Sequence, residues 1–393
     1  MPSLIQQLGP ALDVDARLTE IERGLNLLLN LSPVNAAEAW ADFERSDFGT
    51  VPTLRLRPLE FVPDLVRRDL FNLEVEEVTD PALHTLFWAK RDEMARQITA
   101  LEDRDTSRFV YGSLQLYGGI AQPLASAAEE LLATIPARGP SIRSVTAGAF
   151  AEAARAEFDR YRAVYPDFPA QIEVRDDISE LMVSFGRLLI PATAAIRADR
   201  VEPLLHHEVG THVVTYRNGA RQPLTLLRVG LPGYDETQEG LAVLAEYLAG
   251  GLDPRRLRVL AARVVAVGQM LGGAGFLDIF ESLRVEHQIP ARTAWSITIR
   301  VVVGGGSVKD AIYLRGITRI LEALAEGSSL DVLFVGKLAL DHIPLIQDLL
   351  DRDVLQPPWV RPRWLDVPGA QQRLDRLRAG ASVMDLYEAE VSA

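Results

Sequence analysis

The sequence predicts an α+β fold that is predominantly α-helical and carries a small β-sheet near the middle of the chain. Apolar residues recur at helical spacing over most of the 393 residues. Two segments, residues 170–176 and 180–191, are instead rich in Val, Ile, Leu and Phe and are bounded by turn-forming residues, which is typical of strands. A chain of this length can form one large domain or two of ordinary size.

The segments before the strands predict an N-terminal layer of helices. The helix expected over residues 17–33 ends at a proline, and a long amphipathic helix over 81–105 begins at one. Residues 34–79 are less regular, because prolines are scattered through them. We expect residues 1–95 to form an accessory helical region, although no flexible linker separates it from residues 96–393. Two further helices are expected over residues 123–136 and 144–166.

Helices resume after the strands and fill the second half of the chain. They are expected over residues 235–250, 254–271, 276–287, 291–303, 309–326 and 342–352. The tail over residues 356–368 is rich in proline, so we expect it to cross the surface in extended form.

The composition limits the partners of the protein. The formal net charge is −13, whereas nucleic-acid binding needs clustered Lys and Arg. There is no cysteine, so a metal site would have to use His, Asp and Glu. The first residues lack the basic and apolar regions of a signal peptide, and no apolar run reaches the length of a membrane span. We therefore expect a cytoplasmic protein without nucleic-acid or membrane partners, and the composition leaves the oligomeric state open.

The segment "LLHHEVGTHVV", residues 204–214, concentrates chemistry that a helix does not need for folding. It holds three of the six histidines of the chain and a glutamate between apolar flanks. The flanks indicate a buried helix, and burying imidazoles and a carboxylate without partners costs several kcal/mol. A bound metal would offset that cost. The segment alone leaves a metal site and a histidine-rich structural helix equally open.

The spacing of the two candidate ligands, His207 and His212, requires a local distortion. Residues four apart on an α-helix are offset by about 40°, but residues five apart by about 140°, so these rings would not converge. A π-turn absorbs one extra residue. Gly210 weakens the α-helix inside this interval, and Thr211 can hydrogen-bond to a freed carbonyl. His206 has no ligand partner at helical spacing, so we expect it to support the site or the fold.

A catalytic zinc site usually has three protein ligands, and the next helix offers the third. Its sequence, "GYDETQEGLAVLAEYLAGG" (233–251), places three glutamates on one face. We expect Glu239 to be the third ligand and Glu236 to be the fallback. Glu246 would hold one of the ligand imidazoles from behind. An acidic helix face is ordinarily solvated, but the apolar residues around this one indicate that it is partly buried.

"HEVGTH" (207–212) followed by "QEGLA" (238–242) resembles the flavohemoglobin expression-modulating QEGLA-motif proteins of bacteria. That family is similar to the microtubule-associated tyrosine carboxypeptidases of animals. The resemblance runs from about residue 30 to 380 and also covers "GGGSVKDAIYLRG" (304–316). The combination of motifs is highly specific, whereas either short motif alone is moderately so. The chain lacks a long basic N-terminal extension, so specificity for tubulin is not carried over.

The resemblance implies a zinc metallopeptidase with a zincin-like core over residues 96–393. Matched by motif, His207, His212 and Glu239 would bind Zn²⁺ and Glu208 would be the catalytic carboxylate. Dipeptidyl peptidase III is a separate precedent for histidines five residues apart. The activity implied is removal of a C-terminal residue from a peptide or protein, which is tyrosine in the animal members. The resemblance gives no mechanistic link to flavohemoglobin expression.

A carboxypeptidase also needs a cation for the terminal carboxylate of its substrate. The candidates are Arg300, Lys309 and Arg315, which an ordinary surface helix would explain equally well. Tyr313 could donate a hydrogen bond to the oxyanion. Two alternatives remain open from the sequence, a metal-binding regulatory protein without peptidase activity and an aminopeptidase or endopeptidase of the same zinc class. Glu208 argues against the first, since a purely structural metal site has no need of a carboxylate beside its first ligand.

Overall fold

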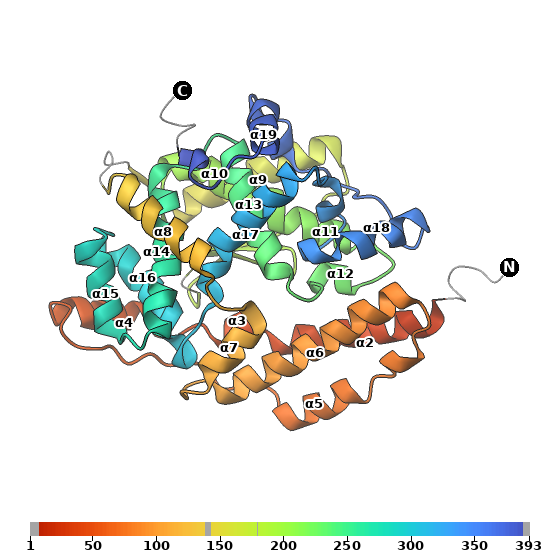
Figure 1. Ribbon diagram of the computed structural model, residues 1–393, viewed down its shortest axis with the longest axis horizontal. Coiled ribbons are helices and arrows are strands. Elements are labelled where there is room, and N and C mark those ends of the chain that lie inside the picture. Colours follow the sequence, from red (N-terminus) through yellow and green to blue (C-terminus); the bar gives the residue numbers. More distant parts are fainter. Residues whose placement is uncertain (1–7, 138–142, 179, 388–393) are drawn as a thin grey trace.

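The computed structural model describes residues 8–137, 143–178 and 180–387, and most of them are helical (Figure 1). The predominantly α-helical α+β fold expected from the sequence is confirmed. The first helices, coloured red to orange in Figure 1, form a layer along one side of the molecule. They are α2 (Gly9–Leu25), α3 (Leu27–Asn30), α4 (Ala36–Arg45), α5 (Pro63–Phe71), α6 (Pro81–Asp103) and α7 (Phe109–Tyr117).

This layer is more regular than its sequence indicated. The segment 34–79 contains α4 and α5, because its prolines stand in loops or, in the case of Pro63, in the first turn of a helix where no backbone N–H is needed. The expected helix over 17–33 begins at Gly9 instead and breaks at Asn26, whose φ of 45° is left-handed. Helix α6 continues through residue 95, where the accessory region was expected to end.

Two small sheets follow α8 (Gln122–Thr134), and α9 (Ala147–Val164) packs against them. In the three-stranded sheet the order is β2-β4-β3, with β4 parallel to β2 and antiparallel to β3. The predicted strand over 180–191 is therefore wrong as one element, because Phe185 and Gly186 turn it into a hairpin with φ of 48° and 71°. The strands are β1 (Ser144–Thr146), β2 (Ile172–Arg175), β3 (Met182–Ser184), β4 (Arg187–Pro191) and β5 (Ala195–Arg197), with β1 antiparallel to β5.

The remaining helices form the centre and the far side of the molecule. Those over 254–271 and 291–302 match the sequence expectation closely, because each combines strong apolar periodicity with a proline at its start. The elements are α10 (Val201–His207), the π-helical η3 (Glu208–Val213), α11 (Val214–Gly219), α12 (Leu226–Val229), α13 (Tyr234–Leu248), α14 (Pro254–Leu271), α15 (Phe276–Glu281), α16 (Ala291–Val302), α17 (Ile312–Ala325), α18 (Ile343–Asp351) and α19 (Ala370–Arg378).

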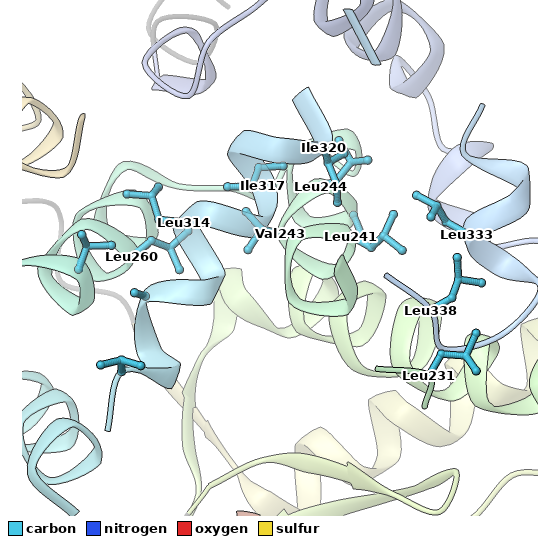
Figure 2. Packing of buried hydrophobic residues seen from close by; sticks show 14 of the residues in the cluster. Leu231, Leu241, Val243, Leu244, Leu260, Leu314, Ile317, Ile320, Leu333 and Leu338 are labelled. Carbon is cyan, nitrogen blue, oxygen red and sulfur yellow. The ribbon is translucent and has the colours of Figure 1, made fainter. Parts of the chain in front are cut away.

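Two hydrophobic clusters hold these elements together. The larger joins the N-terminal layer to α13, α14 and α17, and Figure 2 shows Leu241, Val243 and Leu244 of α13 beside Leu314 and Ile317 of α17. The smaller lies between α9, strand β4 and the π-helical segment. The site described next is positioned by both clusters, since α13 belongs to the first and η3 to the second.

Candidate active site

The histidine-rich segment forms a π-helical turn, as the five-residue spacing predicted. Residues Glu208–Val213 have π-helical hydrogen bonding between α10 and α11. The extra residue in the turn brings the rings of His207 and His212 to the same side, with centroids 5.1 Å apart. The Thr211 hydroxyl donates to the carbonyl of His206 at 3.1 Å, which satisfies a carbonyl that the π-turn frees.

Gly210 is required at this turn by the proline-rich tail. A Cβ at Gly210 would lie 2.8 Å from Cδ1 of Trp364, and the Trp364 indole donates to the Gly210 carbonyl at 3.1 Å. The tail over 356–368 lies largely at the surface, as expected, but buried side chains anchor it to the core. Val360 and Trp364 are fully buried, because the indole fills the space that the glycine leaves open.

Helix α13 brings a carboxylate to the two histidines. Oε2 of Glu239 lies 3.6 Å from Nε2 of His207 and 3.8 Å from Nε2 of His212. The three candidate ligand atoms all lie within 4.8 Å of one another. Oε2 of Glu239 is buried and receives no hydrogen bond from any residue that the structure describes. Two imidazoles and an orphaned carboxylate oxygen are a donor set that suits a divalent zinc ion.

The glycine of the QEGLA motif lets α13 approach its neighbour closely. A Cβ at Gly240 would lie 2.4 Å from the carbonyl carbon of Gly316 in α17. The backbones of the two helices are therefore in direct contact at this crossing. The contact fixes α13 beside η3 and so sets the position of Glu239, the preceding residue.

Glu246, two turns further along α13, holds the first imidazole. Its Oε1 lies 2.7 Å from Nδ1 of His207, and its Oε2 lies 2.7 Å from the guanidinium of Arg200 and 3.4 Å from that of Arg256. Burial raises the pKa of Glu246, but the two arginines and His207 outweigh it and hold the pKa well below the usual range. The carboxylate thus accepts a hydrogen bond from Nδ1–H, which leaves Nε2 of His207 facing Glu239.

The ionisable groups of this cluster are strongly perturbed. Burial raises the pKa of Glu208 to about 7. Burial also lowers the pKa of His212 to about 4, so its imidazole is neutral near pH 7. Burial alone would lower the pKa of His207, but the carboxylates of Glu239 and Glu246 raise it to about 9. Buried groups with divergent pKa values at the base of a cleft are typical of functional sites.

These residues open into a cleft that the N-terminal layer helps to form. Glu208 and the three candidate ligands line its base. One side is apolar and combines the α3 region with the β2–β3 region. Its residues are Leu28, Leu29, Leu31, Ile178, Leu181, Met182 and Val183. Another side is polar and comes from the start of α13, from 299–313 and from Lys337.

The candidate cations are distributed unequally around this cleft. Arg300, Lys309 and Tyr313 line it. The guanidinium of Arg263 lies over the Tyr313 ring, 4.4 Å from the ring centroid. Arg315 does not line the cleft. Its guanidinium binds Glu236 and donates to the carbonyls of Tyr117 and Gly119, the latter at 3.0 Å. The structure therefore does not support Arg315 as a substrate-binding residue.

The fallback ligand Glu236 is also occupied elsewhere. Arg315 binds one of its carboxylate oxygens, and Arg319 donates to the other at 3.0 Å. His206 is buried apart from the metal-ligand cluster, with Nε2 3.8 Å from Oε1 of Glu202, in keeping with a supporting role.

The cleft also contains Lys337, which was not predicted from the sequence. Its residue type could have marked it as a candidate. The chain has three lysines, Lys90, Lys309 and Lys337, whereas all its other Lys or Arg positions are arginines.

Comparison with known protein families assigns the chain to one of them. Residues 41–382 match the microtubule-associated tyrosine carboxypeptidase family, and the chain belongs to that family. The human microtubule-associated tyrosine carboxypeptidase 1 is 34% identical over 134 residues. That match covers 31% of this chain and 27% of the human protein. Within the described residues, no helix combines the length and the apolar character that crossing a membrane requires.

Proposed function

We propose that the protein is a zinc-dependent carboxypeptidase that removes the C-terminal residue of a peptide or protein. The observation that carries the proposal is the convergence of His207, His212 and Glu239 at the base of a cleft, with Oε2 of Glu239 lacking a hydrogen-bond donor among the described residues. Family membership supports the peptidase class. Tyrosine is a reasonable first substrate residue, because the human relative is named a tyrosine carboxypeptidase.

In this proposal the two histidines and Glu239 hold Zn²⁺. The ion would lower the pKa of a bound water to about 7 and polarise the scissile carbonyl. Nε2 is the His207 nitrogen that faces the site, because Nδ1 is engaged by Glu246, and binding of the ion would displace the proton that the raised pKa keeps on this ring. His212 is suited to metal binding because its imidazole is neutral near pH 7.

Glu208 is the proposed general base. Its Oε1 lies 3.9 Å from Nε2 of His207, and its carboxylate lines the base of the cleft. From this position Glu208 can accept the proton of the attacking water and deliver it to the leaving amine. Tyr313 lines the same cleft, and burial raises the pKa of its hydroxyl, so the group stays protonated and can donate to the developing oxyanion.

The proposal is tested by incubating the purified, zinc-supplemented protein with a peptide library of varied C-termini and reading the products by mass spectrometry. We expect products shortened by one C-terminal residue, and we expect Glu208→Gln to form none at a comparable rate. Products shortened from the N-terminus, or cut internally, would assign a different peptidase activity. A metal-loaded protein that cuts no peptide would instead favour a regulatory, metal-binding role.

A further inference from the structure

Among the described residues, four lysine and arginine side chains line the cleft, and they differ in how their charge is balanced. Arg300 donates to Asp310 at 2.7 Å through one nitrogen and binds Glu180 through another. Lys309 donates to Asp235 at 2.9 Å. The other two cations are Arg57 and Lys337. Neither has a carboxylate oxygen within 4.0 Å among the residues that the structure describes, so these two are free to bind an external anion.

Lys337 is held at the cleft by its own backbone. Its N–H donates to the carbonyl of Leu227 at 2.8 Å, and its carbonyl accepts from Leu231 at 3.0 Å. The next residue, Leu338, belongs to the large core cluster and is labelled with Leu231 in Figure 2. The ammonium lies 5.3 Å from the centroid of the Tyr234 ring. A rigid backbone, a half-buried stem and an unpaired charge together indicate a prepared anion-binding group.

Lys337 is also tied to the helix that carries the candidate ligand Glu239. The Tyr234 ring, 5.3 Å from its ammonium, belongs to the first residue of α13, and Glu239 lies further along the same helix. Arg57, in contrast, lies in the loop between α4 and α5. The terminal carboxylate of a peptide is one residue from the scissile carbonyl, a separation of about 3.5 Å along the chain. A carboxylate-binding cation must therefore lie next to the metal-ligand cluster.

The neighbouring lysine strengthens this positive region. The negative charge of Asp235 favours the protonated form of both Lys309 and Lys337, whereas the charge of Lys309 acts on Lys337 in the opposite sense. Asp235 pairs directly with Lys309, and no described carboxylate pairs directly with Lys337. Lys309 Nζ lies 5.2 Å from the centroid of the Tyr117 ring, so an aromatic ring stands beside each lysine. Tyr117 and Tyr234 both line the cleft.

We propose that Lys337 binds the α-carboxylate of the substrate's C-terminal residue. Lys309, which Asp235 holds in place, lies beside it. This inference rests on the proposed carboxypeptidase function and names its ligand class, a peptide with a free C-terminal carboxylate. Arg300 is excluded from the role, since Asp310 and Glu180 already neutralise it. A charge-assisted bond at Lys337 makes cleavage depend on the charge of the last residue rather than on the sequence before it.

The test compares a peptide ending in a free carboxylate with the same peptide ending in an amide. Wild-type protein should favour the acid. Lys337→Met should reduce kcat/KM for the acid roughly 10- to 100-fold and leave the amide unchanged, because a hydrogen bond between charged groups is lost. Lys337→Arg should retain most of the preference. Arg57→Met is the matched control, since it removes the other unpaired cation of the cleft and should preserve the preference.

A binding measurement separates this inference from the proposed function. Zinc-loaded Glu208→Gln protein is titrated calorimetrically with the acid and the amide peptide, with and without Lys337→Met. We expect tighter binding of the acid, and loss of that difference with Lys337→Met. If the wild-type protein cuts peptides while Lys337→Met or Lys337→Gln keeps the acid preference in both assays, Lys337 is not the carboxylate site and the carboxypeptidase stands. Loss of the preference in Arg57→Met would assign the role to Arg57.

Discussion

The metal-ligand cluster and the cationic side of the cleft are built in different ways. His207, Glu208 and His212 lie within one short helical segment, and Glu239 comes from the next long helix, α13. The cations come from the loop between α4 and α5, from α16, from the short η6 turn (Lys309–Ala311) and from the segment after η7 (Asp331–Phe334). Their partners lie up to 120 residues away in the chain, as Arg300 and Glu180 do.

Local sequence is enough to predict the ligand pair but not the role of the cations. A pair of ligands within six residues is constrained by helix geometry alone, so the spacing predicted the π-turn. A cation becomes a candidate ligand-binding group only when its neutralising partners are known. Arg300, Lys309 and Arg315 all looked equivalent in sequence, yet each has acidic or carbonyl partners, and Lys337 was not considered.

The largest expected effect comes from removing both histidines. We expect about one zinc per chain in the wild-type protein and almost none in the double variant His207→Ala, His212→Ala, because one carboxylate alone is too few ligands for a zinc site. The measurement is elemental analysis after dialysis against metal-free buffer. Circular dichroism provides the control for folding. A folded double variant that retains its full zinc content would show that the metal binds elsewhere.

The second prediction separates metal binding from chemistry. Glu208→Gln keeps the shape of the side chain and removes its ability to accept a proton. Peptidase activity should fall by about 10²- to 10⁴-fold, while the zinc content and the melting temperature stay near those of the wild type. Steady-state kinetics with the best substrate of the peptide library provides the measurement. Activity at the wild-type rate would rule Glu208 out as the general base.

The third prediction concerns the carboxylate behind His207. Glu246→Gln removes the negative charge that holds Nδ1–H and balances Arg200 and Arg256. Zinc affinity should fall by roughly 10- to 100-fold, since the partners of ligand imidazoles orient them and raise their basicity. Competition with a chromophoric chelator measures this affinity. An unchanged affinity would mean that His207 is oriented without Glu246.

The smallest effect on catalysis is expected at Arg315, which lies outside the cleft. Arg315→Ala should leave the acid-to-amide preference unchanged and lower the free energy of unfolding by about 1–3 kcal/mol, because it deprives Glu236 and two backbone carbonyls of a donor. Chemical denaturation and the peptide pair provide the two measurements. A lost preference in this variant would return Arg315 to the substrate site.

The parts of the fold that were predicted correctly are those with local causes. Helix α14 matches its expected range because Asp253 caps it, Pro254 starts it and apolar residues repeat along it. The pairing of β1 with β5 was missed because the two strands lie far apart in the chain. The hairpin within 180–191 has a local cause, the turn at Phe185 and Gly186, but the continuous apolar run around that turn indicated one strand. The burial of Trp364 against Gly210 was equally unpredictable, since 154 residues separate the two.

The central claim is that His207, His212 and Glu239 together hold the catalytic metal. Anomalous diffraction at the zinc absorption edge, on crystals of the zinc-loaded protein, tests it most directly. The account predicts one strong peak per chain, about 2.0–2.2 Å from Nε2 of each histidine and from a carboxylate oxygen of Glu239. A peak held by other residues, or a fully loaded protein with no peak between these three side chains, would contradict it.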